Sequence, residues 1–543
     1  MDCTALVEIC DGLFSKRTSL VLLFQDIAEN FYIERADFTY QRTIGTQYGG
    51  QLMSSYPLFC RRDLGDQIGQ MLRPTAKEWF HSKPDDPARE TNDAMQWLQY
   101  ADRVQRRAMF DRVSGFTTAM KQADHDYAAF GQFAMRIRLN RNRNGLLYTT
   151  YHLRDVVWME DVDGQICLIC RKFKSTARDV KRTFKNISPK VEQMIAHGQA
   201  MEEVEMLHII CAADMADVNA KRMDWVSIYY DRSHNFEMET VPTPTKQYVI
   251  SRWQTVSGSQ YAFSPATICA LPDARLIQAM TYTLLEAGER AANPPMAVTH
   301  DVIKSDVGLY PGGLTWIDRD YDERLGEAIR PIMNDSKGLP FGRDMLADGR
   351  QMLMQAFFLN KLSLPQRSPE MTAYEVGQRV QEYIRNALPL FEPMEIESNG
   401  QVCDETFDLL RRNGAFGSPA DMPKSLQGAD IGFGFVSPLH DAIEQIKGQK
   451  FLEAKSLIAE AVAMDQTAAA LVDVKIALRD TLAGIGTPAM WVRSEVEVED
   501  IEAQQQAAAQ AQQTLAAMQQ GADVAGTMAT AQKDRAQAEM AVV

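Results

Sequence analysis

From the start of the chain to about Met135, hydrophobic positions recur mainly at helical spacing. One amphipathic segment is especially clear because polar side chains are interleaved with apolar ones along it: Met95, Leu98, Asp102, Gln105, Met109 and Val113. The pattern breaks before Pro74, which restricts the residue preceding it, and again in the loop-like stretch Lys83–Pro87. The sequence therefore predicts a mostly helical N-terminal part interrupted at these two places.

The period changes to two from Arg136 to Lys174, which predicts a sheet. The stretch Asp161–Gly164 supplies a hairpin turn within it, because an Asp-Gly pair favours positive φ. A second strand-rich stretch runs from Asp224 to Trp253. We therefore expect a β-rich part at 136–253.

Two helices are predicted to flank a small β module marked by proline and glycine. The first, 272–292, opens at Pro272, since proline suits a first helical turn. The second, 343–361, ends at the interruption SLPQRSP. After residue 437 the pattern is helical again, and residues 503–543 hold 14 Ala and 10 Gln, a helix-forming composition with few large apolar side chains.

The charge balance limits the partners that the protein can have. Lys and Arg total 57 against 72 Asp and Glu, a formal net charge of −15, so the chain as a whole repels a polyanion. A DNA-coating protein is excluded, and any nucleic acid must be met by a local patch or held in a channel. The acidic N-terminus is unlike a secretory signal, and no stretch approaches the roughly 18 apolar residues of a membrane helix. We expect a soluble protein, made in a cytoplasm, with reduced cysteines.

The motifs point to no cofactor, no metal and no catalytic centre. Cys167 and Cys170 lack further zinc ligands, and residues three apart on a strand should face opposite sides. The Asp161–Gly164 turn lacks the later acids of a calcium loop, and the glycine pairs lack the Lys-Ser/Thr of a phosphate loop. Asp85 and Asp86 could hold a magnesium ion, but the prolines on both sides mark an exposed loop. An enzyme is therefore a weak interpretation.

Positive charge is concentrated in one part of this acidic chain. Between Arg136 and Asn186 there are 12 Lys or Arg against 5 Asp or Glu. The stretch lacks regularly interleaved aromatic residues, which favours a solvated face or a contact with subunits or acidic partners over nucleic acid. The residues predicted to form this basic patch are Arg171, Lys172, Lys174, Lys181 and Arg182.

Five stretches, in a fixed order, carry a resemblance. They are Ser54–Trp79 (SSYPLFCRRDLGDQIGQMLRPTAKEW), Tyr127–Arg138 (YAAFGQFAMRIR), Asp155–Phe184 (DVVWMEDVDGQICLICRKFKSTARDVKRTF), Tyr310–Gly313 (YPGG) and Met371–Val380 (MTAYEVGQRV). In this order they resemble the head-to-tail connector, or portal, proteins of T7-like short-tailed bacteriophages. The resemblance covers most of the chain.

The resemblance implies an α+β, mainly helical subunit of portal type, with a wing, a stem, a clip and a crown, that assembles into a closed ring of usually twelve copies. The parts would be the wing at 1–271 with its β-rich part at 136–253, the stem helix 272–292, the clip 293–342, the second stem helix 343–361, the tunnel loop 362–371, the wing and crown connecting helices 372–436, the helical crown 437–502, and an Ala/Gln-rich C-terminal helix or barrel at 503–543.

The implied function is a viral portal at one capsid vertex of the virion, synthesised in the host cytoplasm, through which double-stranded DNA is packaged and later ejected through the tail. It would also be the platform for head-tail attachment. The implied partners are copies of itself, DNA in the channel, the terminase large subunit, the major capsid and scaffolding proteins, and tail adaptor and internal core proteins, with no membrane.

Two sets of residues are predicted to carry this function. The predicted DNA-facing tunnel loop holds Lys361, Gln366 and Arg367, and the predicted clip turn for terminase or adaptor docking holds Tyr310, Pro311, Gly312 and Gly313. Net negative charge with few cations at a constriction suits a conduit, because each neutralised phosphate adds affinity that would hold DNA in place.

Two other function classes stay open at this point. One is a scaffold-like structural virion protein built on the Ala/Gln-rich helices, which would form open or transient assemblies instead of rings. The other is a metal-dependent DNA-processing enzyme that uses scattered carboxylates and cleaves DNA with magnesium.

Overall fold

The computed structural model describes most residues up to 435 and scattered residues beyond. The described residues are 2–41, 43, 45, 49–50, 52–74, 78–216, 223–292, 294, 296–298, 329–331, 338–362, 392–418, 421–435, 478, 491, 498, 501, 503–508, 510, 512, 527–528, 530–531, 533 and 535. The chain forms two compact units. The first comprises residues 1–81, 103–417 and 433–442, and the second comprises 82–102, 418–432 and 443–543.

Helices dominate the chain before residue 131, as the sequence predicted. The α-helices are α1 (Cys3–Lys16), α2 (Thr18–Phe31), α3 (Tyr56–Leu72), α4 (Asn92–Met109) and α5 (Phe116–Phe130). The break before Pro74 is confirmed, since α3 ends at Leu72. In the predicted loop Lys83–Pro87, however, the first two residues belong to strand β1 (Phe80–Pro84).

Gly131 joins α5 to the first long strand. Its φ is 71°, and a Cβ at this position would lie 2.1 Å from the backbone carbonyl carbon of Phe263. Only glycine fits a left-handed helix end at such a close approach of backbone.

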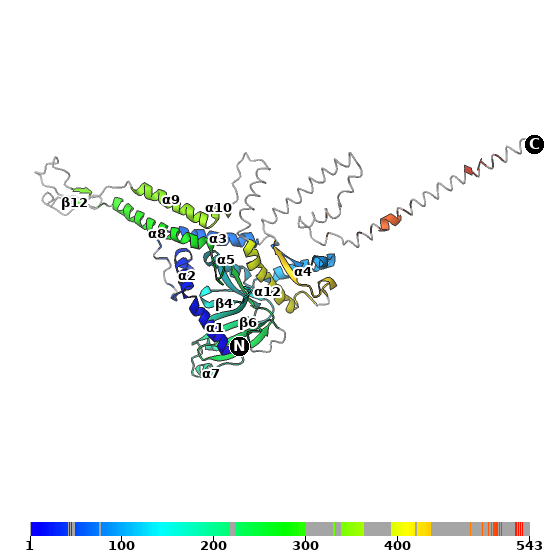
Figure 1. Ribbon diagram of the computed structural model, residues 1–543, viewed down its shortest axis with the longest axis horizontal. Helices are drawn as coiled ribbons and strands as arrows, with labels where there is room; N and C mark the ends of the chain where they lie inside the picture. The colour runs from blue at the N-terminus through cyan, green and yellow to red at the C-terminus, as the bar shows by residue number, and fades with distance from the viewer. Residues whose placement is uncertain are drawn as a thin grey trace, which may run out of the picture. The chain divides into compact units, whose positions relative to one another are not determined.

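Two antiparallel sheets form the β-rich part of the first unit (Figure 1). One has the strand order β3-β2-β9, and the other has the order β4-β5-β6-β7-β8. Their strands are β2 (Gln132–Leu139), β3 (Leu146–Tyr151), β4 (Val156–Glu160), β5 (Ile166–Thr176), β6 (Glu203–Ala212), β7 (Trp225–Asp231), β8 (Phe236–Thr243) and β9 (Tyr248–Arg252). These strands lie within 132–252, the stretch where the sequence predicts a β-rich part at 136–253. The hairpin turn expected at Asp161–Gly164 is present, and Gly164 has a φ of 74°.

A row of buried side chains across the five-stranded sheet shows where its core lies. Val157, Cys170, Ile209 and Ile228 stand directly opposite one another on β4 to β7, and each is at most 2% exposed. Helix α1 packs side chains on the same cluster, which includes Leu6. The short helices α6 (Ala177–Thr183) and α7 (Pro189–Ala196) contribute to a second cluster with Met206 and Met238.

The register of β4 and β5 shifts near Cys167. Met159 pairs with Leu168 while Glu160 pairs with Ile166, so Cys167 is an extra residue in a bulge. Cys167 packs against the cluster that contains Cys170. The expectation that these two cysteines face opposite sides is therefore wrong, because the bulge interrupts the alternation on which it rested.

The long helix after the sheets begins earlier than predicted. Helix α8 spans Pro265–Ala292, so Pro272 lies inside it rather than at its start. The hydroxyl of Ser264 accepts a hydrogen bond from the Thr267 N–H at 3.4 Å, which caps a helix whose first residue is Pro265. The Ser-Pro pair at 264–265, not Pro272, is the start signal.

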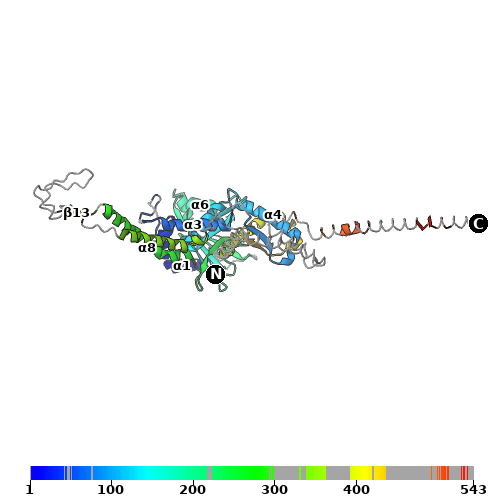
Figure 2. The same ribbon diagram turned by 90° about the horizontal axis from the view of Figure 1, so that it is seen from above.

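The returning helix is interrupted where a single helix over 343–361 was predicted. It comprises α9 (Gly338–Ala356) and a short α10 (Leu359–Leu362), separated by Phe358 with a φ of 57°. A residue with positive φ cannot continue a right-handed helix. Helices α8 and α9 run side by side (Figure 1), and Figure 2 shows α8 from above. Between them in the sequence, β12 (Met296–Val298) pairs with β13 (Ile329–Pro331).

The remaining described elements are short. They are the 3₁₀ turns Ile33–Arg35, Pro87–Arg89, Leu153–Asp155 and Lys424–Leu426, the strands β10 (Gln254–Thr255), β11 (Ala262–Phe263) and β14 (Ile431–Phe435), the π-helical stretch Glu395–Gly400, and α12 (Gln401–Arg412). Most of the predicted clip, nearly all of the tunnel loop and of the predicted crown, and most of the Ala/Gln-rich tail lie outside the described residues. The described part is thus a mixed helix and strand fold.

Candidate functional site

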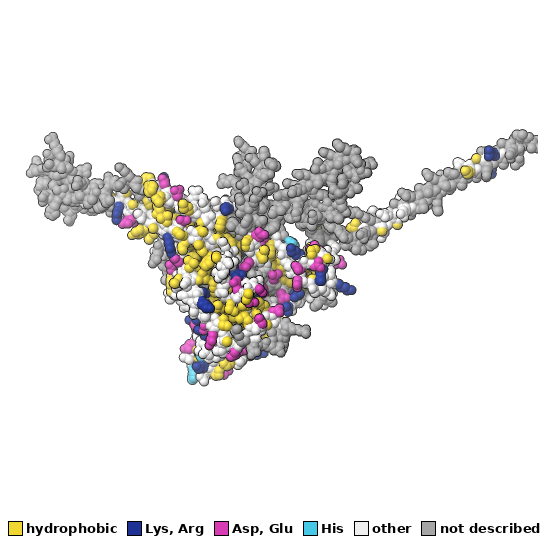
Figure 3. Space-filling model, in the orientation of Figure 1, with side chains coloured by type: hydrophobic (Ala, Val, Ile, Leu, Met, Phe, Trp, Pro, Cys, Tyr) yellow, Lys and Arg dark blue, Asp and Glu magenta, His cyan; other side chains and the backbone are white. Residues whose placement is uncertain are grey.

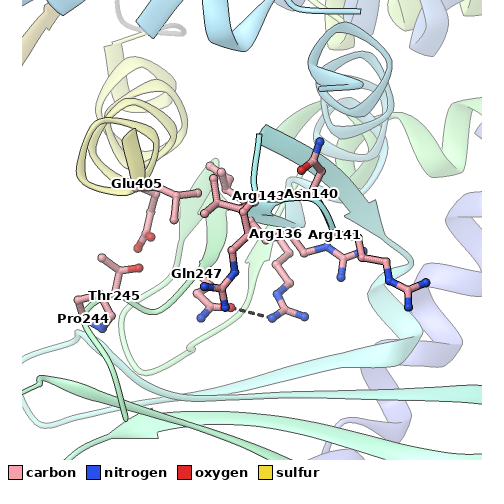
Figure 4. Close-up of a pocket in the computed structure, with 12 residues that line it drawn as sticks. Arg136, Asn140, Arg141, Arg143, Pro244, Thr245, Gln247 and Glu405 are labelled. Carbon is pink, nitrogen blue, oxygen red and sulfur yellow. Dashed lines mark hydrogen bonds between the residues drawn. The ribbon is translucent and has the colours of Figure 1, made fainter. Parts of the chain in front are cut away.

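An arginine-rich pocket opens in the first unit, with a cavity of about 390 Å³. It lies between the end of β2, the β2–β3 turn, the segment before β9, and α12 (Figure 4). The picture places Arg136, Arg141 and Arg143 opposite Thr245 and Glu405. The charged and amide side chains that line the pocket are Arg136, Arg138, Asn140, Arg141, Arg143, Gln247 and Glu405.

Arg136 is the fixed member of this group. It is 7% exposed, and its guanidinium donates hydrogen bonds to the Tyr229 hydroxyl at 2.9 Å and to the Gln247 side-chain oxygen at 2.7 Å. The guanidinium carbon also lies 5.6 Å from the centre of the Tyr248 ring. Arg136 is therefore held in one orientation by neighbours from β7 and β9 and from the segment before β9.

The end of β2 and the β2–β3 turn present the other arginines. The ends of the turn are closed by a hydrogen bond from the Asn140 N–H to the Gly145 carbonyl at 2.8 Å, and the Asn140 side chain accepts from the Asn144 N–H at 3.1 Å. Arg138, Arg141 and Arg143 are exposed, and none of them forms an ion pair with another described residue. Unneutralised guanidinium groups thus project from a defined turn.

One carboxyl group borders the pocket. Burial raises the pKa of Glu405 to about 7, while hydrogen bonds from Thr245 and the Gln247 backbone and the charge of Lys246 offset part of that rise. The nearby Lys246 ammonium donates to the Gln401 side-chain oxygen at 3.1 Å. Near neutral pH the pocket therefore carries an excess of positive charge.

The basic patch predicted from the sequence is largely neutralised within the chain. The Lys172 ammonium lies 3.4 Å from Glu205, the Lys174 ammonium 3.1 Å from Glu203, and the Arg182 guanidinium 3.1 Å from Asp179. Arg171 lies over two aromatic rings, 3.7 Å from that of Tyr151 and 4.5 Å from that of Phe173, and Lys181 is exposed. Its role as a patch for subunits or acidic partners stays a prediction.

Helices α8 and α9 pack closely on one side and leave apolar side chains uncovered elsewhere. Glycines of α9 let the helices approach, since a Cβ on Gly342 would lie 2.6 Å from Leu284 and one on Gly349 3.2 Å from Ile277. Figure 3 shows hydrophobic side chains on the surface of this helix pair. Those of its large hydrophobic side chains that are at least 40% exposed are Ile268, Leu276, Tyr282, Leu285, Phe341, Met345, Met352 and Met354.

Comparison with known proteins assigns the chain. Residues 4–492 match the family described as bacteriophage head to tail connecting protein. The chain belongs to this family. The resemblance to phage connectors seen in the sequence is thereby confirmed.

Two curated relatives of this connector come from other phages. A probable portal protein of Bordetella phage BPP-1 is 22% identical over 442 residues, which cover 79% of this chain and 78% of the relative. The portal protein of Salmonella phage epsilon15 is 22% identical over 492 residues, covering 87% and 85%. A chain of the solved virion of a native gene transfer agent particle aligns over 81% of this chain and 95% of its own length, at 10% identity and a TM-score of 0.34.

The predicted DNA-facing and docking residues of the connector are only partly described. Lys361 is exposed near the end of α10, with its ammonium 5.8 Å from the centre of the Phe358 ring. Gln366 and Arg367 lie outside the described residues, and so do Tyr310, Pro311, Gly312 and Gly313. Both sets of residues stay predictions.

The described residues contain neither a cluster of metal ligands nor a helix that could span a membrane. In this part of the chain, no group of three or more His, Cys, Asp and Glu side chains is placed to hold a metal ion. Within the same residues, every helix is too short or too polar to span a bilayer.

The arginine-rich pocket itself was missed in the sequence. Its arginines belong to the counted excess of positive charge, but Glu405 and Gln247 lie more than 100 residues away in sequence and join it only through the fold. The available signal was the alternate spacing of Arg136 and Arg138, followed by a turn that carries Arg141 and Arg143.

Proposed function

We propose that this connector is a portal subunit and a component of the virion. Copies of it would form a closed ring, of about twelve subunits, at one capsid vertex. Double-stranded DNA would enter through the ring during packaging by a terminase and leave through it into the tail. The match of residues 4–492 to the connector family is the observation that carries this proposal, and the two portal proteins among its relatives support it.

The surface of α8 and α9 supports assembly with further copies. Large apolar side chains such as Leu285 (54% exposed) and Met352 (53% exposed) lie uncovered in the single chain. Burying such side chains releases about 25 cal/mol for each Å² of apolar surface removed from water. Helix pairs packed side by side in a ring would bury them.

The charges of the same helices suit a wall along which DNA slides. Three of the four arginines of α8 and α9 pair with a carboxylate of their own chain: Arg275 with Asp26, Arg290 with Glu286, and Arg343 with Asp344. The fourth, Arg350, lies over the Tyr56 ring. Few free cations remain to neutralise phosphates, so DNA would be held weakly. The two helices would be the stem, the region before them the wing, and the segment between them the clip.

Images of the purified protein in negative stain test this proposal. We expect closed rings with a central hole, and we expect the double variant Leu285→Glu/Met352→Glu to give mostly single subunits, because charged side chains in the contact oppose burial. Val162→Glu is the matched control and should keep the rings, since Val162 is 98% exposed at the tip of a hairpin. Open filaments would favour the scaffold alternative, and single wild-type subunits with magnesium-dependent nuclease activity would favour the enzyme.

The tunnel loop and the clip turn belong to the same proposal. Lys361, Gln366 and Arg367 would face DNA at a constriction, and Tyr310, Pro311, Gly312 and Gly313 would contact the terminase or a tail adaptor. We expect Lys361→Ala/Arg367→Ala to lower DNA packaging or retention without changing ring formation. Unchanged packaging and retention in that variant would contradict the tunnel-loop assignment.

A further inference from the structure

The arginine-rich pocket carries positive charge that ion pairs among the described residues do not neutralise. Arg138, Arg141 and Arg143 are exposed without an ion pair to any described residue, and they stand beside the fixed guanidinium of Arg136. Elsewhere in the β-rich part, lysines such as Lys172 and Lys174 lie beside carboxylates. Like charges gathered on one turn repel one another, and this cost is recovered when an anion binds among them.

We propose that this pocket binds an acidic segment of a partner protein, one that presents two or more carboxylates in succession. Guanidinium groups donate pairs of hydrogen bonds that match the geometry of a carboxylate. Asn140 and Gln247 add amide groups to the lining, and Ile137, Leu139 and Leu409 add apolar surface for the methylene groups of the segment.

Several observations favour a peptide over DNA as the occupant. The cavity of about 390 Å³ is small beside a DNA duplex, whose major groove alone is about 12 Å wide. No aromatic side chain is among the lining residues, so bases would find no stacking platform. The net charge of −15 repels a long polyanion, whereas a short acidic segment meets only the local charge.

A binding measurement with a defined probe tests the proposal. The probe is a fluorescently labelled hexaglutamate peptide, whose anisotropy is followed as the full-length connector is added, with hexaglutamine as the neutral probe. We expect hexaglutamate to bind and hexaglutamine not to bind. We also expect Arg141→Gln/Arg143→Gln to weaken hexaglutamate binding at least tenfold, because each hydrogen bond to a charged group contributes strongly to the free energy of binding.

A charge-matched control separates the pocket from general electrostatics. Lys172→Gln/Lys174→Gln removes the same two positive charges from the β-rich part, but these ammonium groups lie beside Glu205 and Glu203. We expect this variant to bind hexaglutamate within twofold of wild type. Equal weakening by both double variants would overturn the proposal, because binding would then follow net charge alone.

A second variant and a DNA duplex as competing probe complete the binding test. Arg138→Gln changes an exposed residue of β2 and should weaken binding severalfold, which provides a second variant should the turn variant fold poorly by circular dichroism. A duplex of 12 base pairs serves as the competing probe. If the duplex binds in a way that needs Arg141 and Arg143 while hexaglutamate does not bind, the pocket is a phosphate site and the proposal is wrong.

Discussion

The β-rich part and the α8–α9 helix pair use their side chains in different ways. In the five-stranded sheet, the row Val157, Cys170, Ile209 and Ile228 is almost fully buried within one chain. On α8 and α9, residues as large as Tyr282 and Phe341 are 55% and 68% exposed. The core of the sheets is thus buried among the described residues, whereas the helix pair leaves large apolar side chains exposed.

A buried histidine shows that the sheets also satisfy polar groups within the single chain. His208 on β6 lies between the two sheets, with one ring nitrogen 2.7 Å from the Tyr248 hydroxyl and the other 2.9 Å from the Ser227 hydroxyl, and its ring stacks on that of Tyr229. Burial, together with the positive charges of Arg136, Arg171 and Arg138, lowers the pKa of His208, so the ring is neutral at pH 7. A buried group with both nitrogens satisfied stabilises the single chain and needs no partner.

The largest effect is expected from breaking that internal network. His208→Ala removes both hydrogen bonds and leaves a cavity between the sheets, so the free energy of unfolding should fall by about 3–5 kcal/mol. Urea unfolding followed by tryptophan fluorescence at pH 7 measures the loss. His197→Ala, at an exposed site just after α7, is the control and should change stability by less than about 0.5 kcal/mol. Equal midpoints for the two variants would show that His208 does not support the sheets.

Two adjacent residues of α8 sharpen the comparison. Ile277 is fully buried and packs near Gly349, whereas Leu276 is 45% exposed. Ile277→Ala should lower the free energy of unfolding of the single chain by about 2–4 kcal/mol, because it leaves a cavity between α8 and α9.

Leu276→Ala should leave the unfolding of the single chain nearly unchanged and weaken assembly instead. Urea unfolding at low protein concentration and the fraction of rings in negative stain separate the two effects. If Leu276→Ala destabilises the single chain as much as Ile277→Ala, the outer face of α8 is not an assembly surface.

The sequence predicted regular elements well where the local chemistry was sufficient. Alternation after Arg136 and the Asp-Gly turn at Gly164 identified strands and a hairpin, because both signals act between neighbours in the chain. The sequence misplaces the start of α8 by seven residues, because Pro272 suits a first helical turn while the cap is Ser264. The break at Phe358 carries no glycine or proline to reveal it.

The charge pattern could not be interpreted correctly without the fold. The run from Arg171 to Arg182 holds six Lys or Arg. The register of β5 with β6 nevertheless places Glu205 opposite Lys174 and Glu203 opposite Thr176. Cross-strand neighbours therefore neutralise lysines that are some 30 residues away in sequence. The arginines of the β2–β3 turn have no acidic strand beside them. Only the three-dimensional structure shows that they form no ion pair with another described residue.

The smallest effect concerns Glu405, the one carboxyl beside those arginines. Its raised pKa of about 7 means that the folded chain binds a proton more tightly than the unfolded chain does. Stability should therefore fall as pH rises from about 4.5 to 7, and the full cost of the ionised carboxyl is present above pH 7. Lys246, Thr245 and Gln247 face this group from the segment before β9, and Asp408 faces it from α12.

Glu405→Gln removes that cost. The rise from 4.5 to about 7 is about 2.5 pKa units, and at about 1.4 kcal/mol for each unit this sets an upper limit of about 3.5 kcal/mol. Because the side chain is partly exposed and solvent screens its charge, the variant should be more stable than wild type by about 1 kcal/mol at pH 8. It should match wild type at pH 4.5, where the carboxyl is protonated in the folded chain. Urea unfolding at the two pH values measures the difference, and Glu239→Gln, at an exposed site on β8, serves as the control. If the variant were more stable than wild type by the same amount at pH 8 and at pH 4.5, the charge of the carboxyl would not be the cause. Glu405 would then not set the pH dependence of the free energy of unfolding.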